Sequence, residues 1–225
     1  MSPSTRDRPA KAPLSREAVV QAGLKLLRED GIDGVTMRRV AAELDTGAAS
    51  LYVYVKNRQD LLNQMFDAVV GEVDLGDDPD PKRWREQLYD LLDAFRVALE
   101  EHPGLAAVLP GVPVVTDASL GSIENLLGLL VAGGIAPQDA AWACDILMLI
   151  VTATASEADV RAAAGHTIDD DFVEQMRSTF AAVPADLYPN VAAHASELVA
   201  GSGNDRFRFS IDTFLDGLIA RSSRG

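Results

Sequence analysis

The chain has 225 residues, of which 48% are hydrophobic and 24% charged, and its formal net charge is −14 at pH 7. This length suits one large domain, or a small domain joined to a larger one, with enough apolar side chains for a sizeable core. The mean hydropathy is +0.05, and no apolar run reaches the roughly 18 residues that a membrane span needs. Residues 1–13 are polar and lack the apolar region of a signal peptide. We therefore expect no membrane partner and a cytoplasmic location, where the lone Cys144 would be a buried, unpaired thiol.

The charges are unevenly distributed along the chain. Residues 1–60 contain ten Lys and Arg against eight Asp and Glu, a net charge of +2, whereas residues 61–225 have a net charge of −16. Only the first part can therefore approach DNA phosphates favourably. We expect modest non-specific affinity for nucleic acid, so any DNA binding must depend on well-placed contacts.

Helical periodicity runs through the whole sequence, and strand-like alternation is scarce. We predict a first helix from Ser15 to Gly31, a short second helix capped by Thr36, a third helix ending near Val53 and a fourth capped by Asn57. A Gly-Asp-Asp-Pro-Asp-Pro linker at residues 76–81 follows. Beyond it we predict helices over residues 82–101, 117–131, 137–164 and 204–221, with one or two more between 165 and 203. The chain is thus predicted to be all-α, with about nine to ten helices.

The second and third helices have the dimensions of a helix-turn-helix, with the turn at Asp45-Thr46-Gly47. Small side chains on the third helix would let its backbone press into the major groove and touch thymine methyl groups. Arginines on the second helix, and the tyrosines and cations after the third, suit contacts with the DNA backbone. By itself this pattern fits equally well an ordinary helical bundle with half-buried tyrosines and a solvated basic face.

Residues 15–65 resemble the N-terminal domain of the tetracycline-repressor (TetR) family of transcription regulators. The segments that carry the resemblance are Gly31-Ile32-Asp33-Gly34-Val35-Thr36, Val40-Ala41-Ala42-Glu43-Leu44 and Leu51-Tyr52-Val53-Tyr54-Val55-Lys56-Asn57-Arg58. The family writes the last segment as Leu-Tyr-x-His-Phe/Val-x-x-Lys, so Tyr54 replaces a histidine and Arg58 a lysine. The family's Gly-Val-Ser turn is Asp45-Thr46-Gly47 here, which leaves open the operator sequence and whether DNA binding is weakened.

The resemblance implies a three-helix helix-turn-helix head followed by a helical-bundle regulatory domain. The expected boundaries are 1–13 for a disordered tail, 14–60 for the head and 61–225 for an effector-binding and dimerisation domain. It also implies a ligand-responsive repressor, or alternatively an activator, that binds a near-palindromic double-stranded operator as a homodimer and is released by a small molecule. The DNA-binding residues implied are Thr36, Arg38, Ala48, Ala49, Ser50, Tyr52, Tyr54, Lys56 and Arg58.

The remainder resembles the regulatory domain of the same family less specifically. The resembling pieces are Trp84-x-x-x-Leu88, Phe95-Arg96-x-Ala98-Leu99 and His102-Pro103. They imply dimerisation through residues 140–160 and 207–219, and a pocket for an unknown effector among the middle helices. The pocket residues proposed, each of which would serve equally well as plain core, are Trp84, Leu88, Leu91, Phe95, His102, Leu126, Leu130, Trp142 and Met148.

No pattern in the sequence favours an enzyme, a cofactor or a metal site. The chain contains neither a Gly-rich phosphate loop nor a Gly-x-Ser-x-Gly or His-Glu-x-x-His motif. His102, His166 and His194 lack metal-ligand spacing, and the tetracycline repressor's histidine and asparagine ligands for drug and magnesium have no convincing match. The remaining alternative is a helical ligand-binding protein that has lost DNA binding.

Overall fold

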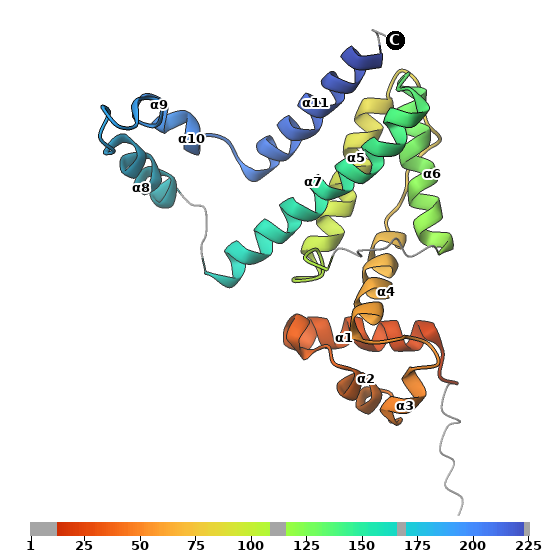
Figure 1. Cartoon of the computed structure of the whole chain (residues 1–225). Helices are drawn as coiled ribbons and strands as arrows, with labels where there is room; N and C mark the ends of the chain where they lie inside the picture. Colours follow the sequence, from red (N-terminus) through yellow and green to blue (C-terminus); the bar gives the residue numbers. More distant parts are fainter. Residues whose placement is uncertain (1–12, 109–115, 166–169, 223–225) are drawn as a thin grey trace, which may run out of the picture. The chain divides into compact units, whose positions relative to one another are not determined.

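The computed structural model describes residues 13–108, 116–165 and 170–222. The predicted N-terminal tail lies almost wholly outside the described residues. Within them the fold is all-α, as predicted, with 11 helices and no strand (Figure 1). The chain divides into two compact units, Met1–Met65 and Phe66–Gly225, which we call the head and the body.

The head consists of α1 (Arg16–Gly34), α2 (Met37–Glu43), α3 (Ala48–Leu51) and the first part of α4 (Arg58–Gly71). The predicted caps of the first two helices are confirmed: Ser15 Oγ accepts from the amide of Ala18 at 3.1 Å, and Thr36 Oγ1 accepts from that of Arg39 at 3.3 Å. Gly31, predicted to stop the first helix, interrupts its helical backbone with φ 71°. The large apolar side chains of α1 are buried, namely Val19, Val20, Leu24, Leu26 and Leu27.

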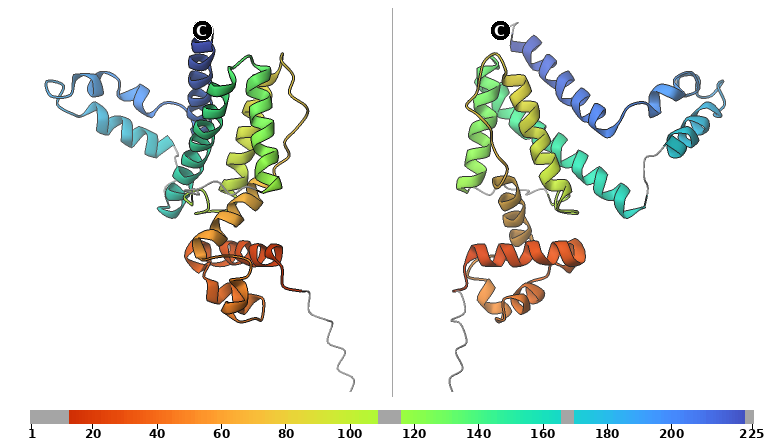
Figure 2. Two further views of the ribbon diagram at one scale, coloured as in Figure 1. Left: turned by 45° about the vertical axis from the view of Figure 1, so that its right-hand side comes forward. Right: turned by 180° about the vertical axis from the view of Figure 1, so that it is seen from behind.

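The body is built around α5 (Trp84–Glu100), α6 (Asp117–Ala132) and α7 (Pro137–Ala163), which pack against one another, with α11 (Gly203–Ser222) packed along α7 (Figure 2). The buried face of α5 follows helical spacing, because residues three and four apart share one side of a helix. Its members are Leu88, Leu91, Leu92, Phe95 and Leu99. Cys144 on α7 is also buried, as predicted, and burial raises the pKa of its thiol to about 11, which keeps it protonated and unreactive.

The segment between α7 and α11 contains more helices than predicted. It forms α8 (Asp170–Ala181), α9 (Pro189–Ala193) and α10 (Ala195–Val199), which contact one another. The expectation of one or two helices was too low because α9 and α10 have five residues each, with a break at His194 (φ −117°, ψ 27°). Helices this short span too few turns to produce a readable apolar period.

Helix α7 is the one helix in the described part of the chain that is long and apolar enough to cross a membrane, by length and composition alone. The core helix of a globular protein has the same composition, so one such helix is weak evidence for a membrane span. Here α7 contacts α5, α6 and α11 and buries Ala140, Leu147 and Val151 among them. We therefore interpret α7 as a core helix of the body.

Trp84 packs directly on Gly133 at the end of α6. A Cβ at position 133 would lie 2.5 Å from two carbon atoms of the indole ring. Because a rigid ring cannot yield by that much, Gly133→Ala is expected to lower the free energy of unfolding of the body by about 1–3 kcal/mol. Urea unfolding followed by tryptophan fluorescence measures this, since both tryptophans belong to the body.

The control for this substitution is Gly121→Ala on the same helix. Its added Cβ would lie 3.7 Å from Leu75 Cδ1, an ordinary contact, and alanine is favoured over glycine inside a helix by about 0.5–1 kcal/mol. If Gly133→Ala unfolds at the same urea concentration as the control, the described packing of Trp84 on Gly133 is wrong.

Candidate functional site

The turn between α2 and α3 closes in a conformation that few residues adopt. Asp45 has φ 48° and is the only non-glycine residue in the left-handed region within the described ranges. Aspartate tolerates this conformation better than most residues. The amide of Thr46 then donates to the carbonyl of Ala41 at 2.9 Å, and Gly47 precedes α3 with extended backbone. The unusual Asp-Thr-Gly sequence therefore still forms the turn of a helix-turn-helix.

Helix α3 presents small side chains to solvent. Of its four residues only Leu51 is buried, while Ala49 and Ser50 are exposed and Ala48 is half-buried. Tyr52, which follows directly, is 57% exposed. The groove-facing residues predicted from the sequence are thus accessible.

Val53 was not among the predicted residues, yet it is 79% exposed beside them. It occupies the variable position of the Leu-Tyr-x segment, so the family pattern held no signal for it. Helical spacing could have indicated its exposure. Leu51 and Val55 are four residues apart and share a buried face, and Val53, midway between them, lies on the opposite side. An exposed methyl pair at this place suits contact with a thymine methyl group.

The predicted cations of the head differ in accessibility. Arg38 on α2 and Lys56 before α4 are exposed. Thr36 is half-buried, and its hydroxyl caps α2, beside the free amides that favour an anion at a helix N-terminus. Arg39, next to Arg38, forms an ion pair with Asp30. Among the residues that the structure describes, Arg38 has no ion-pair partner, so it is the free cation of the two.

Two predicted DNA contacts, Tyr54 and Arg58, donate hydrogen bonds inside the head. The hydroxyl of Tyr54 donates to the carbonyl of Leu14 at 2.6 Å. Arg58 Nε donates to the carbonyl of Val35 at 2.7 Å, and its Nη2 donates to that of Ile32 at 2.6 Å. The bonds of Arg58 join the start of α4 to the end of α1 and the residue after it, and the bond of Tyr54 joins the segment before α4 to the residues ahead of α1. Contact with phosphate stays a prediction for both residues.

The start of α4 is capped by Asn57, and a second hydrogen bond forms one residue before the cap. Asn57 Oδ1 accepts from the amide of Asp60 at 2.8 Å, as predicted. Asp60 Oδ2 accepts from the amide of Lys56 at 2.7 Å. The backbone that carries Lys56 is therefore held in place one residue before the cap.

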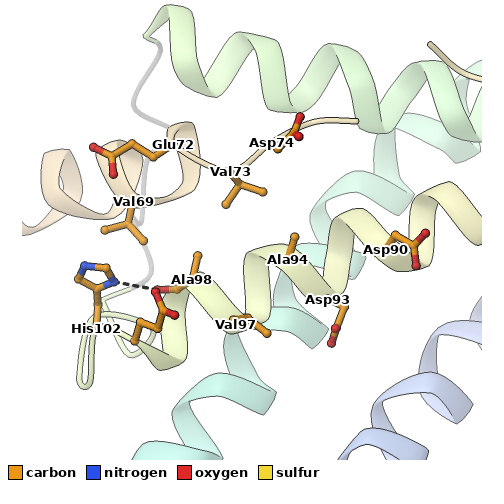
Figure 3. Close-up of a pocket in the computed structure, with 11 residues that line it drawn as sticks. Val69, Glu72, Val73, Asp74, Asp90, Asp93, Ala94, Val97, Ala98 and His102 are labelled. Atoms are coloured by element: carbon orange, nitrogen blue, oxygen red, sulfur yellow. Dashed lines mark hydrogen bonds between the residues drawn. The ribbon is translucent and has the colours of Figure 1, made fainter. Parts of the chain in front are cut away.

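A cavity of about 510 Å³ lies in the body between the end of α4 and one face of α5 (Figure 3). This volume falls in the usual range for small-molecule sites. One of the residues predicted for the effector pocket, His102, lines it, and its Nδ1 lies 2.8 Å from the carbonyl oxygen of Ala98. The lining residues are Val69, Glu72, Val73, Asp74, Asp90, Asp93, Ala94, Val97, Ala98, Glu101 and His102.

The other residues predicted for the pocket are dispersed through the body. Four of them are fully buried as core, namely Leu88, Phe95, Leu126 and Leu130. Leu91 lines a smaller cavity of about 200 Å³ that shares Asp74 and Asp90 with the first. Trp142 is 56% exposed on α7, Met148 is half-buried there, and Trp84 lies against Gly133. The acidic residues of the cavity were missed by the sequence analysis. The spacing of Asp90, Asp93 and Glu101 would have put these three on one helical face.

Two family models match the chain. "Bacterial regulatory proteins, tetR family" matches residues 19–65, and "Tetracyclin repressor-like, C-terminal domain" matches residues 78–222. Among curated proteins, the HTH-type transcriptional repressor DrrR1 of Streptomyces coeruleorubidus is 30% identical over 227 residues, which is 95% of this chain and 82% of the relative.

Solved structures give the same result. Apo ActR from Streptomyces coelicolor superposes with a TM-score of 0.83 at 32% identity, over 96% of this chain and 99% of that one. ActR in complex with actinorhodin superposes with a TM-score of 0.80 at 32% identity, over 93% of this chain and 97% of that one. Their similarity extends over both head and body.

Proposed function

This chain belongs to the TetR family of bacterial regulatory proteins and is a DNA-binding repressor that responds to a small molecule, and we therefore propose that its head reads a near-palindromic operator. The observation that carries the proposal is the accessible, small-faced α3, held behind a closed turn at Asp45 and flanked by exposed Arg38, Tyr52 and Lys56. We further propose that the protein acts in the cytoplasm and by binding alone, without catalysis.

The proposed contacts divide into base readout and backbone binding. Ala48, Ala49 and Ser50 face the floor of the major groove, where methyl groups contact thymine. Arg38 reaches a base edge, most favourably guanine, which offers two acceptors to a guanidinium. The groups that hold phosphate are the helix end at Thr36, the hydroxyl of Tyr52 and the ammonium of Lys56. Tyr54 and Arg58 serve DNA binding by positioning this surface, through their hydrogen bonds within the head.

We propose that the protein is a homodimer joined through α7 and α11. Trp142, Ile146 and Leu149 are exposed at i, i+4 and i+7 along α7, so they form one apolar stripe. On α11, Phe209 is 70% exposed. Exposed apolar stripes of this kind mark protein interfaces. A two-fold dimer would place two heads on half-sites about one DNA turn apart.

The same family membership places the effector in the body. ActR, 32% identical, is known in complex with actinorhodin, so a ligand of drug size suits this chain as well. The cavity lined by the end of α4 is its proposed site. Since α4 also supplies residues of the head, a ligand that prefers one position of α4 would change operator affinity by reciprocal coupling.

The function is tested by selecting bound sequences from a random double-stranded DNA pool, with the wild type beside Arg38→Ala and Tyr52→Ala. The wild type is expected to enrich a near-palindrome, and each variant to lose about tenfold or more in affinity for it, since one specific contact contributes about 1–3 kcal/mol. Arg28→Ala is the matched control, because Arg28 is an exposed arginine of the head at the other end of α1 from Ser15.

Three results decide the proposal. The proposal is supported if the wild type and Arg28→Ala enrich the near-palindrome and the other two variants do not. No enrichment by the wild type at moderate salt contradicts operator reading and favours a helical ligand-binding protein. Equal losses for Arg38→Ala and Arg28→Ala, with none for Tyr52→Ala, would show that only charge, and not the α2–α3 surface, attracts DNA.

A further inference from the structure

The cavity of Figure 3 combines an apolar floor with an acidic rim. The floor is formed by the side chains of Val69, Val73, Ala94, Val97 and Ala98. Val97, in the last turn of α5, is 41% exposed. Apolar surface left open inside a concave site is available to the apolar part of a ligand.

The carboxylates of the rim greatly outnumber nearby cations. Glu72, Asp90 and Glu101 have no ion pair or side-chain hydrogen bond to any residue that the structure describes. Asp93 is paired with Arg96, whose Nη2 lies 2.6 Å from its Oδ1. None of the described residues that line the cavity is a lysine or an arginine. The cavity therefore holds a strongly negative potential, which a concave, partly apolar wall concentrates.

His102 adds an acceptor to this lining. Its Nδ1 faces the carbonyl oxygen of Ala98 at 2.8 Å, so in the neutral ring the proton belongs on Nδ1. Nε2 is then left to accept a hydrogen bond. All the polar side chains of the cavity thus accept hydrogen bonds, and a matching ligand must donate them.

We propose that this cavity binds an organic cation, whose apolar ring system covers the valine and alanine floor and whose positive charge is attracted by the acidic rim that Glu72, Asp90 and Glu101 form. The inference rests on the proposed ligand response and names the chemical class of the effector. An anion would be repelled by the rim, and a neutral molecule would gain no attraction from its charge. A metal ion alone fits poorly, because the floor is apolar and no group of three ligand residues is placed to hold a metal within the described chain.

The test uses two xanthene dyes of opposite charge, rhodamine 6G as the cation and fluorescein as the anion, with fluorescence anisotropy of the full chain. The variant is Glu72→Gln/Asp90→Asn/Glu101→Gln, which keeps side-chain size and removes three charges. The control is Glu124→Gln/Asp186→Asn/Glu197→Gln, which removes three exposed charges outside the cavity. Both variants have the same net charge, so attraction by the acidic chain as a whole is matched.

The wild type is expected to bind rhodamine 6G about tenfold or more tightly than fluorescein, since tenfold corresponds to about 1.4 kcal/mol of charge preference. The cavity variant should lose this preference, and the control should keep it. Equal binding of the two dyes by the wild type, or undiminished preference in the cavity variant, would overturn the inference.

Titration of an operator fragment with the same three proteins separates this inference from the proposed function. Operator binding without any preference for the cation overturns the cation class and leaves operator reading in place. The protein could instead prefer the cation through its cavity carboxylates and bind no operator. That result supports the cation class and contradicts the proposed operator reading.

Discussion

Arg58→Met is expected to lower both the stability of the head and its affinity for DNA. The guanidinium donates two hydrogen bonds, at 2.7 Å and 2.6 Å, to the carbonyls of Val35 and Ile32. Methionine retains the length of the side chain but removes the donor to the carbonyl of Val35 and leaves that of Ile32 with only the 3.3 Å bond from the amide of Val35. Because a hydrogen bond from a charged group contributes about 1.5–3 kcal/mol and this group is half-buried, we expect a loss of about 2 kcal/mol in the free energy of unfolding.

The matched control is Lys56→Met, which removes the same charge two residues earlier from an exposed side chain. Its stability should stay within about 0.5 kcal/mol of the wild type. Its operator affinity should fall with a salt dependence weaker by about 0.9 in the slope of log affinity against log salt, the signature of one lost phosphate contact. Equal stability of the two variants would contradict the positioning role that we give to Arg58.

Thermal unfolding followed by far-ultraviolet circular dichroism, combined with amide hydrogen exchange, makes this comparison. Tryptophan fluorescence does not report on the head, because Trp84 and Trp142 both belong to the body. Faster exchange confined to amides of the head in Arg58→Met is the expected result.

Phe95→Ala is expected to lower the free energy of unfolding of the body by about 3–5 kcal/mol. Phe95 is completely buried on the core face of α5. Removing a ring from a site closed on every side leaves a cavity that the surrounding helices fill only in part. Urea unfolding followed by tryptophan fluorescence measures the loss in the unit concerned.

Phe209→Ala makes the same chemical change at a side chain that is 70% exposed on α11. Within one chain it should cost almost nothing, whereas a dimer joined through α11 should dissociate at higher protein concentration. Light scattering over a dilution series reports this. A stability loss equal to that of Phe95→Ala and independent of concentration would contradict the dimer face, and a wild type that is monomeric at micromolar concentration would exclude it.

The head could be predicted closely from the sequence because its signals are local. Ser15 and Thr36 stand at their caps, Gly31 leaves the helical region, and Asp45 takes the positive φ of the turn. Each of these features depends on a few neighbouring residues and elementary backbone sterics. Hydrogen bonds between distant parts are different, so the internal bonds of Tyr54 and Arg58 could not be foreseen from a pattern of residue types.

The cavity that we propose for the effector was not found from the sequence, because the pocket residues were chosen there by side-chain size. Large apolar residues such as Leu88 and Phe95 fill the core, since burial is where they stabilise most. Which face of α5 remains open depends on which helices cover the other face, a property of the whole body. The open face carries Asp90 and Glu101, residues that size alone would never select.

The buried and exposed residues of α3 have separate roles, and this affects how the operator preference of such a repressor changes in evolution. Leu51 alone anchors the helix in the head, while Ala49 and Ser50 point outward and contact nothing that the fold requires. Exposed positions of this kind accept new side chains with little change in stability. With operator reading by α3 as proposed, a duplicated copy of this protein can therefore acquire a different operator through one or two substitutions, without first acquiring compensating mutations elsewhere.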